Sequence, residues 1–358
     1  MADQLKNWFN QDYLNKLAVE IQSVYEPFQI ENFVTSTMDE TWDSLELKGR
    51  VNQITANMQK YLPKDYPAAI SILDKVVAVH KSDFGIFFPT FVEMFGLDEK
   101  HWDISMDALA LYTQYSSSEF AVRPFIINHE EKMMAQMYVW SKHENEHIRR
   151  LSSEGCRPAL PWGQALAKYK KDPTPILPIL EQLKADPSLY VRKSVANNLN
   201  DISKTHPDLV AKIAKQWYGK NEHTNWVVKH GCRSLLKKGN KDVLTIFGFT
   251  AAAAVSDFAI NEVAVSIGGD VAFSFTISTA EEAKIRLEYG IDYVKANGKR
   301  NRKIFQISES TFPKNETKRY TKNHSLADLS TRKHYPGVHS ITLIVNGEEK
   351  GTLDFDLI

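Results

Sequence analysis

Two stretches of the chain, NEHIRRLSSEGCR at Asn145–Arg157 and NEHTNWVVKHGCR at Asn221–Arg233, are alike at both ends. The triplets NEH and GCR recur at the same internal spacing, 76 positions apart (221 − 145). Between the two copies, residues 188–207 read SLYVRKSVANNLNDISKTHP, a third stretch with helical spacing of its apolar residues. A repeat of about 38 residues, two in 76, is typical of helix pairs that stack on one another.

The intervening stretch identifies the kind of repeat. From Asp186 it follows D-P-x-x-x-V-R-x-x-x-A, the pattern of a HEAT-type second helix, and the HEAT period is about 40–47 residues. Apolar residues at i, i+3 and i+4 also occur in NQDYLNKLAVEIQSVY, VNQITANMQKYL, YPAAISILDKVVAVH and DISMDALALYTQY. The sequence therefore predicts an α-solenoid of HEAT-like helical repeats up to about residue 250.

The pattern changes after about Ala251, where apolar and polar residues begin to alternate in short stretches. Gly268–Gly269, Asn297–Gly298, Pro313, Pro336–Gly337 and Asn346–Gly347 provide turn signals between them. The seven expected strands are NEVAVSI, DVAFSFTIS, AKIRLEYGIDYV, KIFQIS, ETKRYTK, HSITLIV and GTLDFDLI. Seven short strands in about 100 residues predict an all-β immunoglobulin-like sandwich. We expect a multidomain chain, with the helical repeats in residues 1–254 and the sandwich in residues 255–358.

The formal net charge of zero hides an asymmetry along the chain. Residues 1–122 hold 9 Lys/Arg and 18 Asp/Glu (9 − 18 = −9), whereas residues 123–241 hold 21 and 11 (21 − 11 = +10). Basic side chains on one surface attract phosphate, so the middle segment predicts an anionic partner, with a solvated helix face as the alternative. The candidates for phosphate contact lie on the second helices of successive repeats: Arg149, Arg150, Arg157, Arg192, Lys193, Lys229 and Arg233.

The sequence has no apolar run of about 18 residues, and its first residues lack the basic and apolar regions of a secretory signal. Its two cysteines, Cys156 and Cys232, fit neither a disulfide framework nor a zinc-ligand spacing. We therefore expect a cytoplasmic protein with no membrane partner.

One short motif points to a different chemistry. HENEH at His143–His147 matches H-E-x-x-H, in which two histidines on one helix face bind zinc and the glutamate acts as a base. Its second half belongs to the NEH repeat, and the copy at Asn221 has no second histidine in the matching place. We therefore interpret NEH as a helix start and expect no metal, with a zinc peptidase as the weakest alternative. The chain contains no G-x-x-x-x-G-K-[ST], G-x-G-x-x-G or G-x-S-x-G, so neither nucleotide nor serine-hydrolase chemistry is indicated.

Three acids and one tryptophan lie among the basic residues. Glu119 is expected to open a helix in SSSEFAVRPF, and Glu154 ends a basic helix in RRLSSEGCRPALPW. Asp201 is expected at the end of a helix, where the helix dipole disfavours an acid, so its position favours a functional role. Structural alternatives are a dipole partner for Glu119, an i, i+4 pair with Arg150 for Glu154, and a place in the core for Trp162.

The segments SSSEFAVRPF, RRLSSEGCRPALPW and VRKSVANNLNDISKTHP together resemble the DNA alkylation-repair glycosylases of the AlkC kind, relatives of AlkD. The resemblance covers essentially the whole chain, including the appended immunoglobulin-like domain that only part of the AlkC group carries. It implies a HEAT-like solenoid whose concave side binds a bent duplex, with the sandwich holding the DNA from the other side. The acidic and aromatic active-site positions of the group fall on Glu119, Glu154, Trp162 and Asp201.

The resemblance implies a monofunctional glycosylase that excises 3-methyladenine and 3-methylcytosine from double-stranded DNA without flipping the base and without a cofactor. Such a base is already cationic, hence a good leaving group, and cleavage develops oxocarbenium character on the sugar. We expect Asp201 to stabilise that charge, Glu119 and Glu154 to orient the base and the water, and Trp162 to pack on the sugar or base. We also expect a monomer. The alternative function is a non-catalytic HEAT scaffold that binds an acidic protein or DNA.

Overall fold

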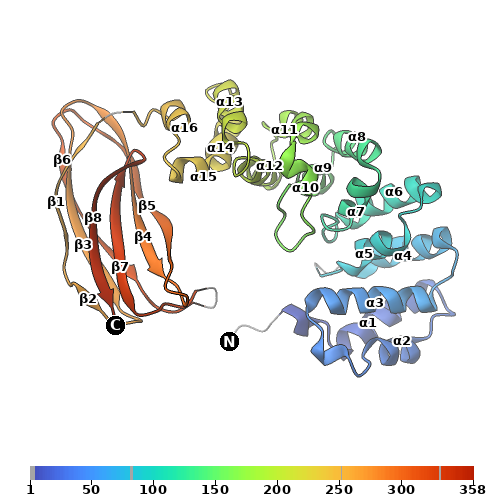
Figure 1. The fold of residues 1–358 in the computed structure, drawn as a ribbon. Helices are drawn as coiled ribbons and strands as arrows, with labels where there is room; N and C mark the ends of the chain where they lie inside the picture. Colours follow the sequence, from blue (N-terminus) through green and yellow to red (C-terminus); the bar gives the residue numbers. More distant parts are fainter. Residues whose placement is uncertain (1–4, 81–83, 251, 330–331) are drawn as a thin grey trace. The chain divides into compact units, whose positions relative to one another are not determined.

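The structure is a computed structural model that describes residues 5–80, 84–250, 252–329 and 332–358. Its first two-thirds is helical (Figure 1). Short 3₁₀ segments occur at Leu5–Trp8, Trp42–Ser44, Glu99–His101 and Thr174–Ile176. The α-helices in the described ranges are α1 (Gln11–Val24), α2 (Ile30–Thr37), α3 (Leu47–Tyr61), α4 (Tyr66–His80), α5 (Phe87–Phe95), α6 (Trp102–Tyr112), α7 (Val122–Asn128), α8 (Glu130–Trp140), α9 (Glu146–Glu154), α10 (Ala167–Lys171), α11 (Leu177–Leu183), α12 (Leu189–Ile202), α13 (Pro207–Trp217), α14 (Glu222–Gly231), α15 (Arg233–Lys237) and α16 (Lys241–Ile246).

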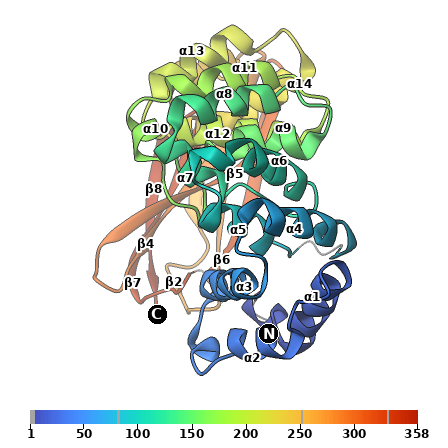
Figure 2. The same ribbon diagram turned by 90° about the vertical axis from the view of Figure 1, so that its right-hand side faces the viewer.

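The repeated sequence produces repeated helix pairs. Helix α9 packs on α8 and α12 packs on α11, and the second helices α9, α12 and α14 pack in series. Figure 2 shows α8, α9 and α12 as neighbours in this stack. The NEH triplets are helix starts, as the sequence predicted: Asn145 caps α9 by accepting a bond from the His147 amide, and the Asn221 side chain accepts one from the Thr224 amide in α14.

The glycines of the two GCR triplets let neighbouring helices approach closely. A Cβ atom added to Gly155 would lie 2.5 Å from Val122 Cγ2, and one added to Gly231 would lie 3.0 Å from Leu199 Cβ. Real Cβ atoms essentially never lie within 3.0 Å of such a neighbour, so the first position has no room for a side chain. The following cysteines, Cys156 and Cys232, are both buried and free. The glycine and the cysteine of the repeated GCR triplet are therefore explained by close packing between helices.

The last third is a β-sandwich. One sheet has the order β1–β3–β6 and the other has the order β2–β8–β7–β4–β5, with β2 parallel to β8. Their facing sides enclose a core that includes Phe273, Ile291 and Leu343. This architecture confirms the predicted all-β domain. The strands are β1 (Ala254–Ile260), β2 (Ala264–Val265), β3 (Asp270–Ser278), β4 (Ala283–Val294), β5 (Arg300–Phe312), β6 (Thr317–Ser325), β7 (Gly337–Val345) and β8 (Glu348–Leu357).

The seven predicted strands correspond to β2–β8, and β1 was missed. The stretch before it is rich in alanine, which does not alternate in polarity, and every residue of β1 is exposed or half-buried. The hairpin signals were informative, since Asn346 and Gly347 adopt positive φ values of 49° and 79° between β7 and β8.

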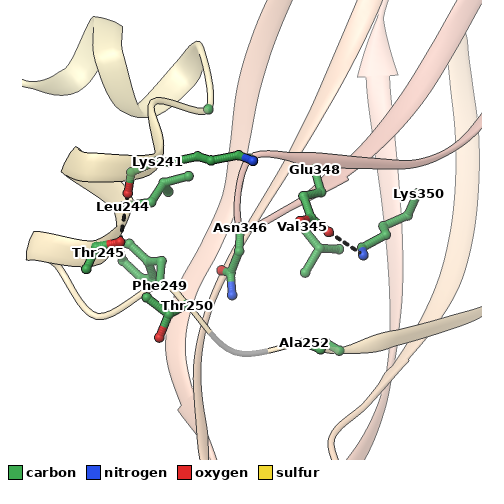
Figure 3. Close-up of a pocket in the computed structure, with 13 residues that line it drawn as sticks. Lys241, Leu244, Thr245, Phe249, Thr250, Ala252, Val345, Asn346, Glu348 and Lys350 are labelled. Atoms are coloured by element: carbon green, nitrogen blue, oxygen red, sulfur yellow. Dashed lines mark hydrogen bonds and ion pairs between the residues drawn. The ribbon is translucent and has the colours of Figure 1, made fainter. Parts of the chain in front are cut away.

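Contacts divide the chain into two compact units: residues 1–205 with 221–231, and residues 206–220 with 232–358. The second unit includes α16 and the turn between β7 and β8, which line a cavity of about 330 Å³ together (Figure 3). The two glycines Gly239 and Gly347 meet there, so closely that a Cβ added to Gly239 would lie 2.6 Å from the Gly347 carbonyl oxygen. The predicted limits, 1–254 and 255–358, lie close to the change from helices to strands. As limits of domains they stay a prediction. The junction predicted at Ala251 lies outside the described residues.

Within the described ranges, each helix is too short or too polar to cross a lipid bilayer.

Candidate active site

The three acids predicted from the sequence lie in one network of ion pairs in the helical unit. Arg150 Nη1 lies 2.7 Å from Glu119 Oε2, and Arg150 Nη2 lies 3.8 Å from Glu154 Oε1. The same Glu154 oxygen lies 2.5 Å from Arg157 Nη1, and Arg157 Nε lies 2.9 Å from Asp201 Oδ2. Arg150 therefore links Glu119 to Glu154, and Arg157 links Glu154 to Asp201. The three acids come from three different segments of the chain.

The local folds of these segments explain how the acids meet. Glu154 is the last residue of α9, and Asp201 is the residue before the last one of α12, as predicted. Glu119 does not open a helix, contrary to the prediction: it lies in the turn before α7, which begins at Val122. Because α9 packs on α12, Arg157, which follows α9, reaches the C-terminal turn of α12.

The network is largely removed from water. The side chains of Asp201, Glu154 and Arg157 are 2%, 7% and 9% exposed, and those of Glu119 and Arg150 are 15% and 16% exposed. Lys204, one turn after Asp201, closes the network at 2.9 Å from Asp201 Oδ1.

The charges of the network support one another. Burial lowers the pKa of Arg157, but the Glu154 and Asp201 carboxylates outweigh burial and raise this pKa above its ordinary value. Arg150 is governed in the same way: burial lowers its pKa, and the carboxylates of Glu119 and Glu154 raise it by more. Asp201 thus has two basic partners that offset its unfavourable place at a helix C-terminus.

Trp162 lies outside the core, on a loop that a buried arginine holds. Its side chain is 80% exposed and its backbone φ is 62°, in the left-handed region. Arg123, 1% exposed, donates to the carbonyl oxygens of Gly155 and Arg157 at 2.8 and 3.0 Å and to that of Gln164 at 2.5 Å. The core alternative for Trp162 is therefore wrong, and one side chain ties both ends of the Trp162 loop to α7.

An apolar cavity of about 460 Å³ adjoins Trp162 in the helical unit. Its lining includes Val51 of α3, Ile86 and Thr90 at α5, and Phe120, which follows Glu119. Trp162 therefore lines this cavity from the loop that follows Glu154 and Arg157 of the ion-pair network.

The residues predicted to bind phosphate have different surroundings. Arg150, like Arg157, already pairs with carboxylates of the network. Arg149 binds Asp186 at 2.7 and 3.1 Å, and Arg192 donates to the carbonyl oxygens of Asp186 and Pro187. These bonds give the four arginines a structural role, and their contacts with phosphate stay predictions. Lys193 and Lys229 are exposed, and Arg150 and Arg233 are half-buried.

The HENEH motif does not form the arrangement that zinc enzymes require. His143 precedes α9, and its Nδ1 accepts a bond from the Asn145 amide, whereas His147 lies inside the helix. The two histidines therefore do not share a helix face. In the described ranges, His, Cys, Asp and Glu side chains form no group of three or more that is placed to hold a metal ion.

The sequence did not single out Tyr190, which also belongs to the site. The guanidinium of Arg150 lies over its ring at 4.8 Å. Burial raises the pKa of the Tyr190 hydroxyl; the charge of Arg150 lowers this pKa, and the nearby carboxylates add a smaller increase. Its position two residues before Arg192 in the V-R pattern was the available signal, because this places Tyr190 in the first turn of a second helix.

Comparisons with known proteins agree with this geometry. The family model "DNA alkylation repair enzyme" matches residues 101–235, which include all the acids of the network. The structure of Pseudomonas fluorescens alkylpurine DNA glycosylase AlkC, bound to DNA containing an abasic site analog, matches this chain with a TM-score of 0.95. The two proteins are 35% identical, and the match covers 99% of this chain and 100% of that one. The chain belongs to the AlkC family.

The carboxyl-terminal sandwich is part of this family relationship. Residues 254–358 match the family model "Uncharacterised protein YhaZ, C-terminal Ig-like domain". The uncharacterized protein YhaZ of Bacillus subtilis (strain 168) is 49% identical over 359 residues and covers 100% of both chains. The helical region followed by an immunoglobulin-like domain is therefore an AlkC-like fold, as the sequence predicted.

Proposed function

We propose that this protein is a monofunctional DNA glycosylase that removes cationic N-alkylated bases, 3-methyladenine and 3-methylcytosine, from double-stranded DNA in base excision repair. The observation that carries the proposal is the full-length match to a DNA-bound AlkC glycosylase. The ion-pair network alone does not distinguish an enzyme from a scaffold. Its acidic side chains are paired with arginines and a lysine, and such ion pairs also have a structural purpose.

The chemistry assigned to each residue follows from the reaction. Alkylation at N3 makes the base cationic, so it leaves readily and needs no general acid. As the glycosidic bond breaks, positive charge develops on the deoxyribose. We assign the stabilisation of this charge to Asp201, whose carboxylate Arg157 and Lys204 hold in a fixed orientation. Water takes the place of the base on the sugar carbon and loses a proton, which leaves an abasic site.

Glu119, Glu154 and Trp162 complete the proposed site. The two glutamates orient the cationic base and the attacking water, and Trp162 packs on the sugar or base with a cation–π contribution of about 0.5–2 kcal/mol. Its 80% exposure leaves the indole available to a ligand. The proposal includes catalysis without base flipping, without a cofactor, by a cytoplasmic monomer.

The test compares Asp201→Asn with Asp186→Asn in the full chain. Both acids are buried and paired with an arginine, but Asp186 belongs to the Arg149 pair. On methylated duplex DNA under single-turnover conditions, we expect Asp201→Asn to excise about 10²–10³-fold more slowly and to bind the duplex with nearly wild-type affinity. Asp186→Asn is expected to retain faster excision than Asp201→Asn at equal folded fraction.

The two functions give opposite results in a direct assay. A glycosylase releases free methylated bases and leaves alkali-labile abasic sites. If the wild-type protein binds DNA and releases no base, the scaffold alternative is correct. If Asp201→Asn excises at the wild-type rate, Asp201 has no part in the mechanism.

A further inference from the structure

The guanidinium of Arg150 lies in a set of groups that would recognise a planar cation. Glu119 Oε2 is 2.7 Å from one of its nitrogens and Glu154 Oε1 is 3.8 Å from another. The Tyr190 ring lies beneath it at 4.8 Å, and Ser117 Oγ lies 3.3 Å from Nη1. Two carboxylates, an aromatic face and a hydroxyl are a binding site for a flat, positively charged group.

The charges of the network balance with Arg150 in place. Its acids are Glu119, Glu154 and Asp201, and its bases are Arg150, Arg157 and Lys204. Asp201 and Glu154 would both retain Arg157 if Arg150 moved away. Glu119 depends on Arg150 for its counter-charge. Among the described residues, Arg150 is the basic side chain that lies within ion-pair distance of Glu119.

We propose that Arg150 is an internal stand-in for the charge of the cationic base: in the free protein its guanidinium compensates the two carboxylates that face the alkylated base in the complex. This inference rests on the proposed function. When the duplex binds, the alkylated base stays in the duplex and its positive charge faces the two carboxylates. Arg150 then leaves them for a DNA phosphate, which is the contact expected from its place on a second helix. One planar cation replaces another, so the buried carboxylates stay compensated throughout.

The exchange explains how the free protein keeps these acids folded in its interior. A neutral base cannot replace the guanidinium, because it would leave a poorly solvated carboxylate without a counter-charge. The preference for cationic over neutral bases therefore comes from Glu119 and Glu154, whereas Arg150 sets how much attraction the base must overcome before it binds. Removing Arg150 is expected to open the place to small cations from solution.

The test uses full-length Arg150→Ala and methylguanidinium as the probe, with sodium chloride at equal ionic strength as the reference. For a dissociation constant of about 10 mM, 20 mM methylguanidinium raises the KM for methylated DNA roughly threefold in this variant. The matched control is Arg50→Ala, because Arg50 also lies over an aromatic ring, Trp42, but donates to the carbonyl oxygens of Lys6 and Phe9. We expect less than a twofold change in Arg50→Ala and in the wild-type protein.

A second measurement needs no DNA. Methylguanidinium is expected to raise the thermal midpoint of Arg150→Ala relative to sodium chloride, and the additional change Glu119→Gln is expected to abolish this shift. Arg150→Met, which keeps most of the side-chain stem, replaces Arg150→Ala if the latter does not fold. An unchanged KM, or faster excision on adding methylguanidinium, overturns the inference, because the ion would then replace only a lost phosphate contact. If the wild-type protein releases no base, the proposed function fails, while the thermal shift still decides whether the cation site exists.

Discussion

Arg157 is the connection on which the buried network depends most. Its guanidinium joins Glu154 to Asp201 at 2.5 and 2.9 Å, and its side chain is 9% exposed. Arg157→Met keeps the apolar stem and removes the charge, so both carboxylates lose their shared base. Breaking a buried ion pair from one side costs about 3–5 kcal/mol, because a buried charge is left uncompensated. Lys204 still pairs with Asp201, which places the expected loss of unfolding free energy near the lower value, about 3 kcal/mol.

The assay is urea unfolding of the full chain, followed by tryptophan fluorescence, because all seven tryptophans precede the strands. Lys204→Met is the matched control: it removes a charge from the same Asp201, but the lysine side chain is 50% exposed. Exposed ion pairs contribute little, so we expect a loss of less than about 1 kcal/mol. If the two variants lose equal amounts, the free energy attributed to the buried bridge is wrong.

Four further outcomes are expected. Burial, with smaller contributions from the charges of Arg332 and His334, lowers the pKa of His324 from 6.5 to about 4, so the unfolded chain binds the proton first as the pH falls. The contribution of neutral His324 to the stability of the sandwich is therefore present above pH 6.5, and the stability falls by about 3 kcal/mol towards pH 4. Hydrogen exchange in β6 is expected to show this loss in the wild type but not in His324→Gln. Gly155→Ala is expected to destabilise the helical unit by about 1–3 kcal/mol in urea unfolding, whereas Gly49→Ala, whose closest contact is the movable end of Leu45, is expected to be neutral or stabilising. Trp162→Ala is expected to change the unfolding free energy by less than about 0.5 kcal/mol while excision falls, and equal losses of both would contradict its exposed, functional role. Lys193→Glu is expected to weaken duplex binding on all sequences and to flatten the salt dependence, so salt-independent binding would exclude a phosphate contact.

The fold was largely predictable because its signals are local. Helix starts at Asn145 and Asn221 depend on a side chain capping an amide two or three residues away. The strands of the sandwich alternate over short stretches, and the Asn346–Gly347 turn needs positive φ values that Asn and Gly tolerate. Strand β1 was missed because its weak alternation follows a run of alanines. Its place is decided by pairing with β3, from Ala254 opposite Ser278 to Ile260 opposite Phe273.

The candidate site was predictable by residue but not by contact. Glu154 and Asp201 were placed at helix ends, and this was correct. Their common partner could not be read from the sequence, because Arg157 and Asp201 are 44 positions apart and meet only where two helices pack. The same reason explains why Tyr190 was missed: its ring becomes part of the site through the guanidinium of Arg150 on another helix.

The sequence by itself determined the kind of molecule: repeated helix pairs followed by a sandwich, with a basic middle segment and acids at the ends of helices. Periodicity, capping and turn chemistry act over a few residues, so they can be recognised in the amino-acid sequence. Only the tertiary structure decided that these acids share their bases, that Trp162 is exposed and that Arg150 lies between two carboxylates. Those facts depend on distances between segments that are far apart in the sequence. The packing of these segments determines both which charges are buried and which charges compensate one another.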